Sequence, residues 1–227
     1  YHMVFNGEIY NFLELKKDLE KQGTPFTTNS DSEELLKLFA KEGLSCLKKL
    51  NCMFAFAIWD KVDQKLYAAR DRMGKKPFYY TIADDQFIFA SELKAILKHP
   101  SVKKELDPEA VRHFFTYEYV PAPYAIIKGV HKLKQAHCLV YDGDINMNRY
   151  WNQSFTPSLD IDEREATKGL MERLDKATSY RLISDVPLGV FLSGGIDSSA
   201  VVALMARQRA AKDLSLIHIS EPTRQDR

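Results

Sequence analysis

A short segment towards the C-terminal end combines two glycines, three serines and one aspartate: Leu192-Ser193-Gly194-Gly195-Ile196-Asp197-Ser198-Ser199. The apolar run before it predicts a buried strand over 186–192, and the residues after it predict a helix over 200–211. Open α/β sheets bind ligands at the carboxyl ends of their strands, where this segment would lie. Amides exposed by glycine and the following helix N-terminus favour an anion, so the pattern predicts a phosphate-binding loop.

Individual side chains of this loop could contribute to phosphate binding. The hydroxyls of Ser193, Ser198 and Ser199 can donate hydrogen bonds, and Asp197 could hold a magnesium ion or cap the helix. The loop lacks the Gly-Lys-Ser/Thr ending of a P-loop, which excludes an ordinary kinase or GTPase. A tight strand-to-helix turn that uses glycine for its geometry alone is the structural alternative.

Two segments near the N-terminal end could also do chemistry. The first is Phe5-Asn6-Gly7-Glu8-Ile9-Tyr10-Asn11, in which Asn-Gly between apolar residues by itself predicts a hairpin turn. The second, Ser30-Asp31-Ser32-Glu33-Glu34, predicts a helix start of the capping-box type, with a Glu reaching back to a free amide. An Asp at a helix N-terminus stays ionised, because the helix dipole favours negative charge there.

The elements that would position these segments are short strands and amphipathic helices. Apolar spacing predicts helices over 8–22, from the capping box to 41, over 44–50, over 91–98 and from Asp107-Pro108 onward. Residues 53–59 are apolar on both faces and predict a central strand. Other strands are expected at 3–6, 26–29, 65–70, 77–82 and 87–90, with a hairpin of 137–141 and 145–150.

A polar stretch containing Pro157 predicts a domain boundary, and we place a first domain over 1–152 and a linker over 153–162. A helix over 163–182 is expected next. With the strand, loop and helix around Gly194, it predicts the start of an α/β domain with a parallel sheet over 163–213. The predicted fold class is therefore α+β followed by α/β.

The composition argues against several classes of function. The 227 residues carry a formal net charge of +1, which gives no electrostatic support for a nucleic-acid partner. Apolar runs such as 53–59 are too short to cross a membrane, and no signal peptide opens the chain. Cys46, Cys52 and Cys138 fit no metal-binding spacing and favour a reduced, cytoplasmic protein.

Several of these motifs resemble known families. The Ser-Gly-Gly-x-Asp-Ser pattern resembles the PP-loop of ATP pyrophosphatases, which cleave ATP between the α and β phosphates and adenylate a carboxylate or similar oxygen. The Asn-Gly-Glu-Ile-Tyr-Asn segment resembles the oxyanion-hole segment of class II glutamine amidotransferases, and residues 53–57, 70–77, 90–95 and 119–123 resemble the same domain. A glutaminase half followed by this PP-loop is typical of glutamine-hydrolysing asparagine synthetases, which the chain resembles over about residues 1–211.

The resemblance implies an Ntn-hydrolase-type α/β/β/α glutaminase sandwich, followed by the start of a PP-loop ATP pyrophosphatase (adenine nucleotide α-hydrolase-like) domain. It implies that the Asn6 side-chain amide and the Gly7 backbone N–H form an oxyanion hole. Glu8 would help to bind glutamine, and Asp31 would bind the α-amino group of the substrate. The implied ATP site consists of Leu192, Ser193, Gly194, Gly195, Asp197, Ser198 and Ser199, with Asp197 as a candidate ligand for Mg²⁺.

The chain departs from the family pattern at both ends. The family nucleophile is an N-terminal cysteine whose own amine serves as the base, whereas Tyr1 stands here and the internal cysteines match no family nucleophile. We expect the nucleophile and the arginine that binds the substrate carboxylate upstream, and this chain alone to be inactive. Residues 214–227 resemble translated sequencing-adaptor DNA and not the family, so His218 is not considered a ligand.

The resemblance thus implies that the complete protein makes asparagine from aspartate, with ATP and with ammonia from glutamine. Two alternatives stay open. One is a related amidotransferase that acts on another carboxylate, such as a cell-surface sugar acid, or closes a β-lactam ring. The other is a non-catalytic, nucleotide-binding protein of amidotransferase type. A homodimer is also left open, whereas no partner among nucleic acids or membranes is expected.

Overall fold

The computed structural model describes residues 1–155, 160–184, 187–208 and 214–218. The chain divides into unit 1, residues 1–154, and unit 2, residues 155–227, and each unit is described by itself. Part of the predicted linker, residues 156–159, lies outside the described residues, as do 185–186 at the predicted strand start. In the described parts of the chain, no helix is long and apolar enough to cross a membrane.

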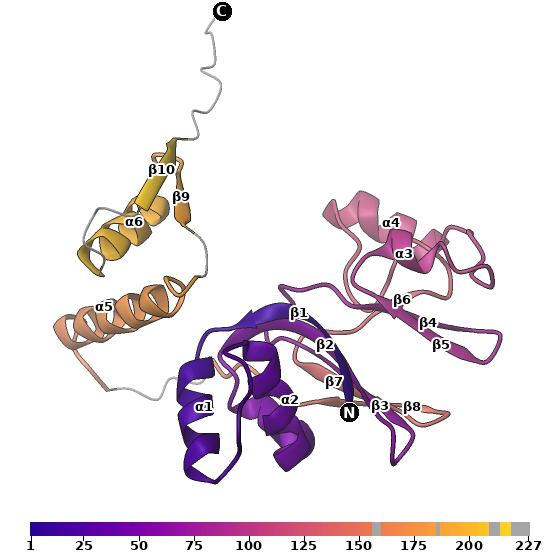
Figure 1. Cartoon of the computed structure of the whole chain (residues 1–227). Coiled ribbons are helices and arrows are strands. Elements are labelled where there is room, and N and C mark those ends of the chain that lie inside the picture. The colour runs from indigo at the N-terminus through magenta and orange to yellow at the C-terminus, as the bar shows by residue number, and fades with distance from the viewer. Residues whose placement is uncertain (156–159, 185–186, 209–213, 219–227) are drawn as a thin grey trace, which may run out of the picture. The chain divides into compact units, whose positions relative to one another are not determined.

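A five-stranded antiparallel sheet forms the centre of unit 1 (Figure 1). β2 lies inside this sheet, and its residues from Phe54 to Ile58 are buried, which confirms the predicted central strand. The predicted hairpin across Asp142-Gly143 is also confirmed. The strand order is β1 (His2–Ile9), β2 (Cys52–Asp60), β3 (Lys65–Arg70), β7 (His137–Tyr141) and β8 (Ile145–Arg149).

The second sheet of unit 1 has three antiparallel strands in the order β5 (Gln86–Ala90), β4 (Tyr79–Ala83) and β6 (His131–Lys132). Strands β4 and β5 overlap closely with the predicted strands. Sequence analysis does not predict β6, because two residues are too few to show a period. Only its pairing with Tyr79 and Tyr80 of β4 defines it as a strand.

Helices cover the five-stranded sheet on the face away from the second sheet. They are α1 (Phe12–Lys21), α2 (Asp31–Glu42) and the 3₁₀ helix η1 (Gly43–Lys48). Leu19 and Leu35 of these helices pack in one core with Phe54 and Phe56 of β2. The alternate residues of β2 point the other way, because successive side chains of a strand face opposite sides.

Those alternate residues form the core between the two sheets, where Ala55 and Ala57 pack with Phe78 and Leu133. A third core lies beyond the second sheet, where Ile96 of α3 (Leu93–Ile96) packs with Ile88 of β5. Helix α4 (Pro108–Tyr117) follows on this side (Figure 1) and begins at the predicted cap Asp107. The layers of unit 1 therefore run helix, sheet, sheet, helix.

Several predicted boundaries near the N-terminal end are wrong. β1 continues through Ile9, so the helix predicted from residue 8 begins only at Phe12. The Asn6-Gly7 pair lies inside this strand and makes no hairpin turn. Residues 26–29 form no strand, since the polar contacts of the next helix hold their backbone instead.

Unit 2 contains α5 (Glu163–Tyr180), β9 (Leu188–Leu192), α6 (Ile196–Gln208) and β10 (Leu214–His218). The two strands pair in parallel, as expected for an α/β domain. A carboxylate oxygen of Asp175 in α5 accepts from Arg207 Nη2 of α6 at 2.5 Å. β10 lies in the segment 214–227 that sequence analysis sets apart from the family, and that interpretation stays a prediction. Residues 219–227 lie outside the described residues.

Two expectations for unit 2 are not met. β9 is not buried on both faces, since Phe191 is 64% exposed. Helix α6 begins at Ile196 and not at residue 200. Asp197, Ser198 and Ser199 therefore lie in the first turn of the helix, and the loop is shorter than predicted.

Glu34 of α2 is a fully buried carboxylate, three residues after Asp31. Among the described residues neither of its oxygens has a hydrogen-bond partner, and the Lys16 ammonium lies 3.9 Å away. Burial raises the pKa of Glu34, because the charged form loses its hydration. Above its folded-state pKa, the charge therefore costs stability.

We expect Glu34→Gln to raise the free energy of unfolding at pH 7 by about 1 kcal/mol, because it removes this buried charge. The gain should vanish as the pH falls below about 4.5, where Glu34 is protonated in both states. Urea unfolding followed by tryptophan fluorescence measures it, since Trp59 and Trp151 both lie in unit 1. Glu42→Gln, on the same helix but paired with Lys49 at 2.5 Å, is the control and should not stabilise. A destabilised Glu34→Gln protein would contradict the expectation.

Candidate functional site

Strand β1 places Asn6, Gly7 and Glu8 on the edge of the five-stranded sheet. Asn6 is paired with Ala55 of β2 and Gly7 with Phe54. A Cβ atom at Gly7 would lie 2.3 Å from the Met53 carbonyl oxygen and 2.7 Å from Phe54 Cα. Only glycine therefore fits at this point, where the β2 backbone approaches closely.

Asp31 is tied to the end of the same strand. One of its carboxylate oxygens accepts from the Ile9 backbone N–H at 3.0 Å, so the start of α2 lies beside the Glu8–Ile9 peptide. Asp31 is half-buried, whereas Glu8 is exposed. The hydrogen bond thus brings Asp31 of α2 next to the end of the candidate segment of β1, although residues 9–30 separate Glu8 from Asp31 in the sequence.

The capping box predicted at this helix is only half right. Ser30 is the N-cap, and its hydroxyl oxygen accepts from Ser32 N at 3.3 Å. Glu33 does not reach back to Ser30 but accepts from the backbone N–H groups of Thr27 and Thr28, at 3.0 and 2.6 Å. Hydrogen bonding to Lys37, whose ammonium lies 2.6 Å away, and to Thr28 holds the pKa of Glu33 well below its usual range. The segment that leads into Asp31 is therefore fixed by charge-assisted contacts.

Asn6 also makes a contact between the two sheets. Its side-chain Nδ2 donates to Ser91 Oγ at 3.0 Å, and Ser91 directly follows β5 of the second sheet. Both residues line a cavity of about 390 Å³, whose other walls include Ala55, Phe78 and Phe89. Sequence analysis assigns no role to Ser91. It finds that residues 90–95 resemble the glutamine amidotransferase domain, but it gives none of these residues a function.

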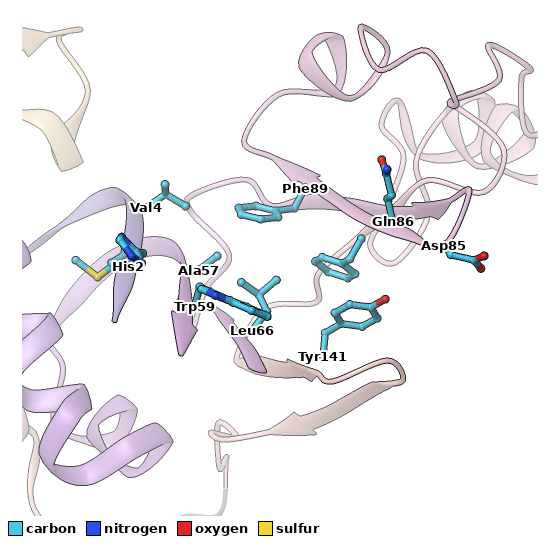
Figure 2. Close-up of a pocket in the computed structure, with 11 residues that line it drawn as sticks. His2, Val4, Ala57, Trp59, Leu66, Asp85, Gln86, Phe89 and Tyr141 are labelled. Carbon is cyan, nitrogen blue, oxygen red and sulfur yellow. The ribbon is translucent and has the colours of Figure 1, made fainter. Parts of the chain in front are cut away.

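A second hollow of about 500 Å³ adjoins this cavity, since Val4, Ala57 and Phe89 line both. Figure 2 shows Trp59 and Tyr141 of the five-stranded sheet on one side of it and Phe89 of β5 on the other. The space between the sheets is therefore apolar along most of its length and has a polar end at Asn6. Apolar walls with a few convergent polar groups are typical of ligand sites.

The three cysteines are poor candidates for a nucleophile. Burial raises the pKa of Cys46 to about 12, and it also raises the pKa values of Cys52 and Cys138. A reactive cysteine needs a lowered pKa, because the thiolate is the nucleophile. The geometry thus agrees with the sequence-based interpretation that these thiols are structural.

The predicted phosphate-binding loop lies between β9 and α6, at the carboxyl end of the strand. Gly194 has φ +80°, a conformation that glycine adopts without strain. The Ser198 and Ser199 hydroxyls both donate to the Gly195 carbonyl oxygen, at 3.0 and 2.8 Å. These hydroxyls would have to turn from this carbonyl to donate to a phosphate, whereas the amides of the first turn of α6 already point along the helix axis.

Asp197 is the one acidic residue in the first turn of α6, and it is exposed. Within the described residues, no group of three or more His, Cys, Asp or Glu side chains could hold a metal ion. Mg²⁺ commonly takes one or two carboxylates together with substrate phosphates and water. A single carboxylate beside the predicted phosphate-binding loop fits that pattern.

Comparisons with known proteins find two families on this chain, one in each unit. Residues 1–151 match the family described as glutamine amidotransferase domain, and residues 169–225 match asparagine synthase. A putative glutamine-hydrolysing asparagine synthetase from Methanocaldococcus jannaschii is 41% identical over 95% of this chain and 42% of its own length. Asparagine synthetase 3 of Bacillus subtilis is 39% identical over 91% of this chain and 34% of its own length.

One solved structure, described as the allosteric regulatory enzyme of purine biosynthesis, overlaps 97% of this chain and 47% of its own, with 18% identity and a TM-score of 0.47. The chain spans less than half the length of the two curated relatives named above. The glutamine amidotransferase match covers well over half of the chain and contains Asn6, Asp31 and Ser91. The chain therefore belongs to the glutamine amidotransferase domain family, in the form in which this domain is followed by an asparagine synthase segment.

Proposed function

We propose that these residues are part of a glutamine-hydrolysing asparagine synthetase. Its first domain would release ammonia from glutamine, and its second would use ATP to activate aspartate as an adenylate, giving asparagine, AMP and pyrophosphate. The observation that carries the proposal is the order of two matches on one chain, glutamine amidotransferase before asparagine synthase. We infer an Ntn-hydrolase-type glutaminase domain over 1–152, a linker over 153–162 and the start of a PP-loop synthetase domain over 163–213.

In the glutaminase domain, Asn6 and Gly7 would stabilise the oxyanion of the tetrahedral intermediate through the side-chain amide and the backbone N–H. The Asn6 amide has two N–H groups, and Ser91 accepts from this nitrogen at 3.0 Å, so the second can point towards a ligand. Asp31 would accept from the α-amino group of glutamine, and Glu8 would contact the same substrate. Support comes from the Ile9–Asp31 hydrogen bond, which holds Asp31 beside Glu8.

The nucleophile is proposed to come from a part of the enzyme outside these 227 residues. Each thiol of this chain has a pKa raised by burial, so none has the properties of an activated cysteine. The length of the relatives supports this arrangement, since this chain spans 42% of the archaeal one.

In the synthetase domain, the loop from Ser193 to Ser199 would bind the phosphates of ATP, with Leu192 against the nucleotide. Gly194 and Gly195 allow a close approach, and the N-terminal turn of α6 supplies amides and a favourable dipole. Mg²⁺, when bound, would neutralise phosphate charge, and Asp197 is the residue we propose to hold it. Glutamine, aspartate and ATP are the proposed ligands, and the cytoplasm is the proposed location, because the three cysteines are free thiols.

Asn6→Ala in the complete enzyme is expected to lower kcat for glutamine hydrolysis about 100-fold, the usual loss for one oxyanion-hole donor. The KM for glutamine should change little, because the amide acts mainly on the charge that develops in the transition state. Ammonia release measures the effect. Asparagine formation from added ammonium chloride should persist, because the synthetase domain then no longer depends on Asn6.

The matched control is Asn146→Ala. Asn146 lies on β8, the opposite edge strand of the same sheet, and it is exposed. This variant should keep the glutaminase activity of the original enzyme. An Asn6→Ala enzyme with unchanged kcat would show that Asn6 stabilises no oxyanion and would refute the proposed role of this site.

A further inference from the structure

We propose that Ser91 is a positioning residue of the glutaminase site, which orients the Asn6 amide for the oxyanion. This inference rests on the proposed function, in which Asn6 is an oxyanion donor. Ser91 would act through Asn6 and touch no reacting atom. Nothing in the local sequence points to it, since 84 residues lie between the two partners.

The contact itself is specific. Asn6 Nδ2 donates to Ser91 Oγ at 3.0 Å, and this bond is partly shielded from solvent. The terminal torsion of an asparagine side chain is soft and roughly two-fold, so an unrestrained amide can turn its oxygen to where its nitrogen was. An oxygen facing the oxyanion would repel it. The hydrogen bond from Nδ2 to Ser91 Oγ, in which the hydroxyl oxygen accepts, holds the amide with its nitrogen at the polar end of the cavity.

Ser91 is a fixed acceptor because of the elements on both sides of it. Its predecessor Ala90 ends β5 and is paired with Tyr79 of β4. Two residues after it, Leu93 begins α3, whose Ile96 is fully buried in the third core. Ser91 therefore belongs to the second sheet layer, whereas Asn6 belongs to the first.

The hydrogen bond thus spans the two sheets at the polar end of the cavity of about 390 Å³. The neighbouring wall residues Ala55, Phe78 and Phe89 are apolar and offer the amide no side-chain acceptor. If the hydroxyl is removed, the amide loses its orienting contact while the walls of the cavity stay in place. The expected loss is in catalysis, not in substrate binding.

The test is a double-mutant cycle on glutamine hydrolysis in the complete enzyme. Ser91→Ala should lower kcat about 10-fold, the usual worth of one hydrogen bond, with little change in the KM for glutamine. Ser91→Thr keeps the hydroxyl and should restore most of the rate. In the Asn6→Ala background, Ser91→Ala should have no further effect, because the group it positions is gone.

Thr81→Ala is the matched control. It also removes a hydroxyl from the second sheet, where Thr81 Oγ1 donates to the Gly129 carbonyl oxygen at 2.8 Å, and Thr81 has no contact with Asn6. Any effect of Thr81→Ala should be the same with and without Asn6. Circular dichroism of each variant, with Ser91→Thr as the second substitution at this site, separates misfolding from loss of positioning.

Two results would overturn the inference. One is a Ser91→Ala enzyme whose kcat is unchanged, and the other is an equal loss in the presence and absence of Asn6, which would make Ser91 merely structural. Both leave the oxyanion role of Asn6 intact if Asn6→Ala alone is slow. If Asn6→Ala alone is fully active, the proposed function of this site fails first, and the two failures are thereby distinguished.

Discussion

Replacing Gly7 by alanine is expected to lower the free energy of unfolding of unit 1 by at least ~4 kcal/mol, beyond the usual range for one added methyl group. The new Cβ would lie 2.3 Å from the Met53 carbonyl oxygen and 2.7 Å from Phe54 Cα. Both are backbone atoms of β2, which cannot turn aside as a flexible side chain can. Strand β1 would have to move away from β2, taking Asn6 and the Ile9 partner of Asp31 with it.

Urea unfolding followed by tryptophan fluorescence measures this loss, because Trp59 and Trp151 both report on unit 1. Gly143→Ala is the matched control in the same unit. It adds the same methyl group where no atom lies within 4 Å, so only its φ of +107° opposes the change. That strain should cost about 1 to 3 kcal/mol. A Gly7→Ala chain as stable as Gly143→Ala would mean that β2 does not approach so closely.

Gly7 also explains why local patterns alone misplace this segment. Asn-Gly favours a hairpin because both residues tolerate positive φ, yet here the glycine is needed for space within an extended strand. The neighbour that requires it is Phe54, far along the chain. β2 is the opposite case. Its central position is predicted correctly, because a strand that is buried on both faces consists of consecutive apolar residues, and these are visible in the local sequence.

The candidate site was predictable to a similar extent. The motifs containing Asn6 and Asp31 are visible in the sequence, and the structure places them at one end of β1. Ser91 could not be found in this way, because its partner lies in another sheet and no periodicity links the two. In unit 2, the sequence pattern predicts a loop where α6 has its first turn, because glycine and serine are common both in loops and at helix starts.

Asp71→Ala is expected to lower the free energy of unfolding of unit 1 by about 4 kcal/mol, because it leaves four backbone N–H groups, one of them buried, without their acceptor. Asp71 is 2% exposed. One of its carboxylate oxygens accepts from Met73 N and Lys75 N, both at 3.0 Å. The other accepts from Lys76 N at 3.0 Å and from Phe54 N at 3.2 Å, which ties this loop to β2 beside Gly7.

Arg70 contacts the same loop but cannot replace the Asp71 carboxylate, because a guanidinium only donates hydrogen bonds. Its guanidinium donates to the carbonyl oxygens of Lys76, Gly74 and Leu133 at 2.6 to 2.7 Å, so it fixes the acceptors of the loop while Asp71 fixes the donors.

The same urea unfolding experiment tests the prediction for Asp71→Ala. Asp60→Ala is the control: Asp60 is also buried and accepts from two turn amides, at 2.8 and 3.2 Å, besides a hydrogen bond from the Tyr1 side chain, and its loss should cost about half as much. Equal losses for the two variants would contradict the view that the number of satisfied amides sets the cost.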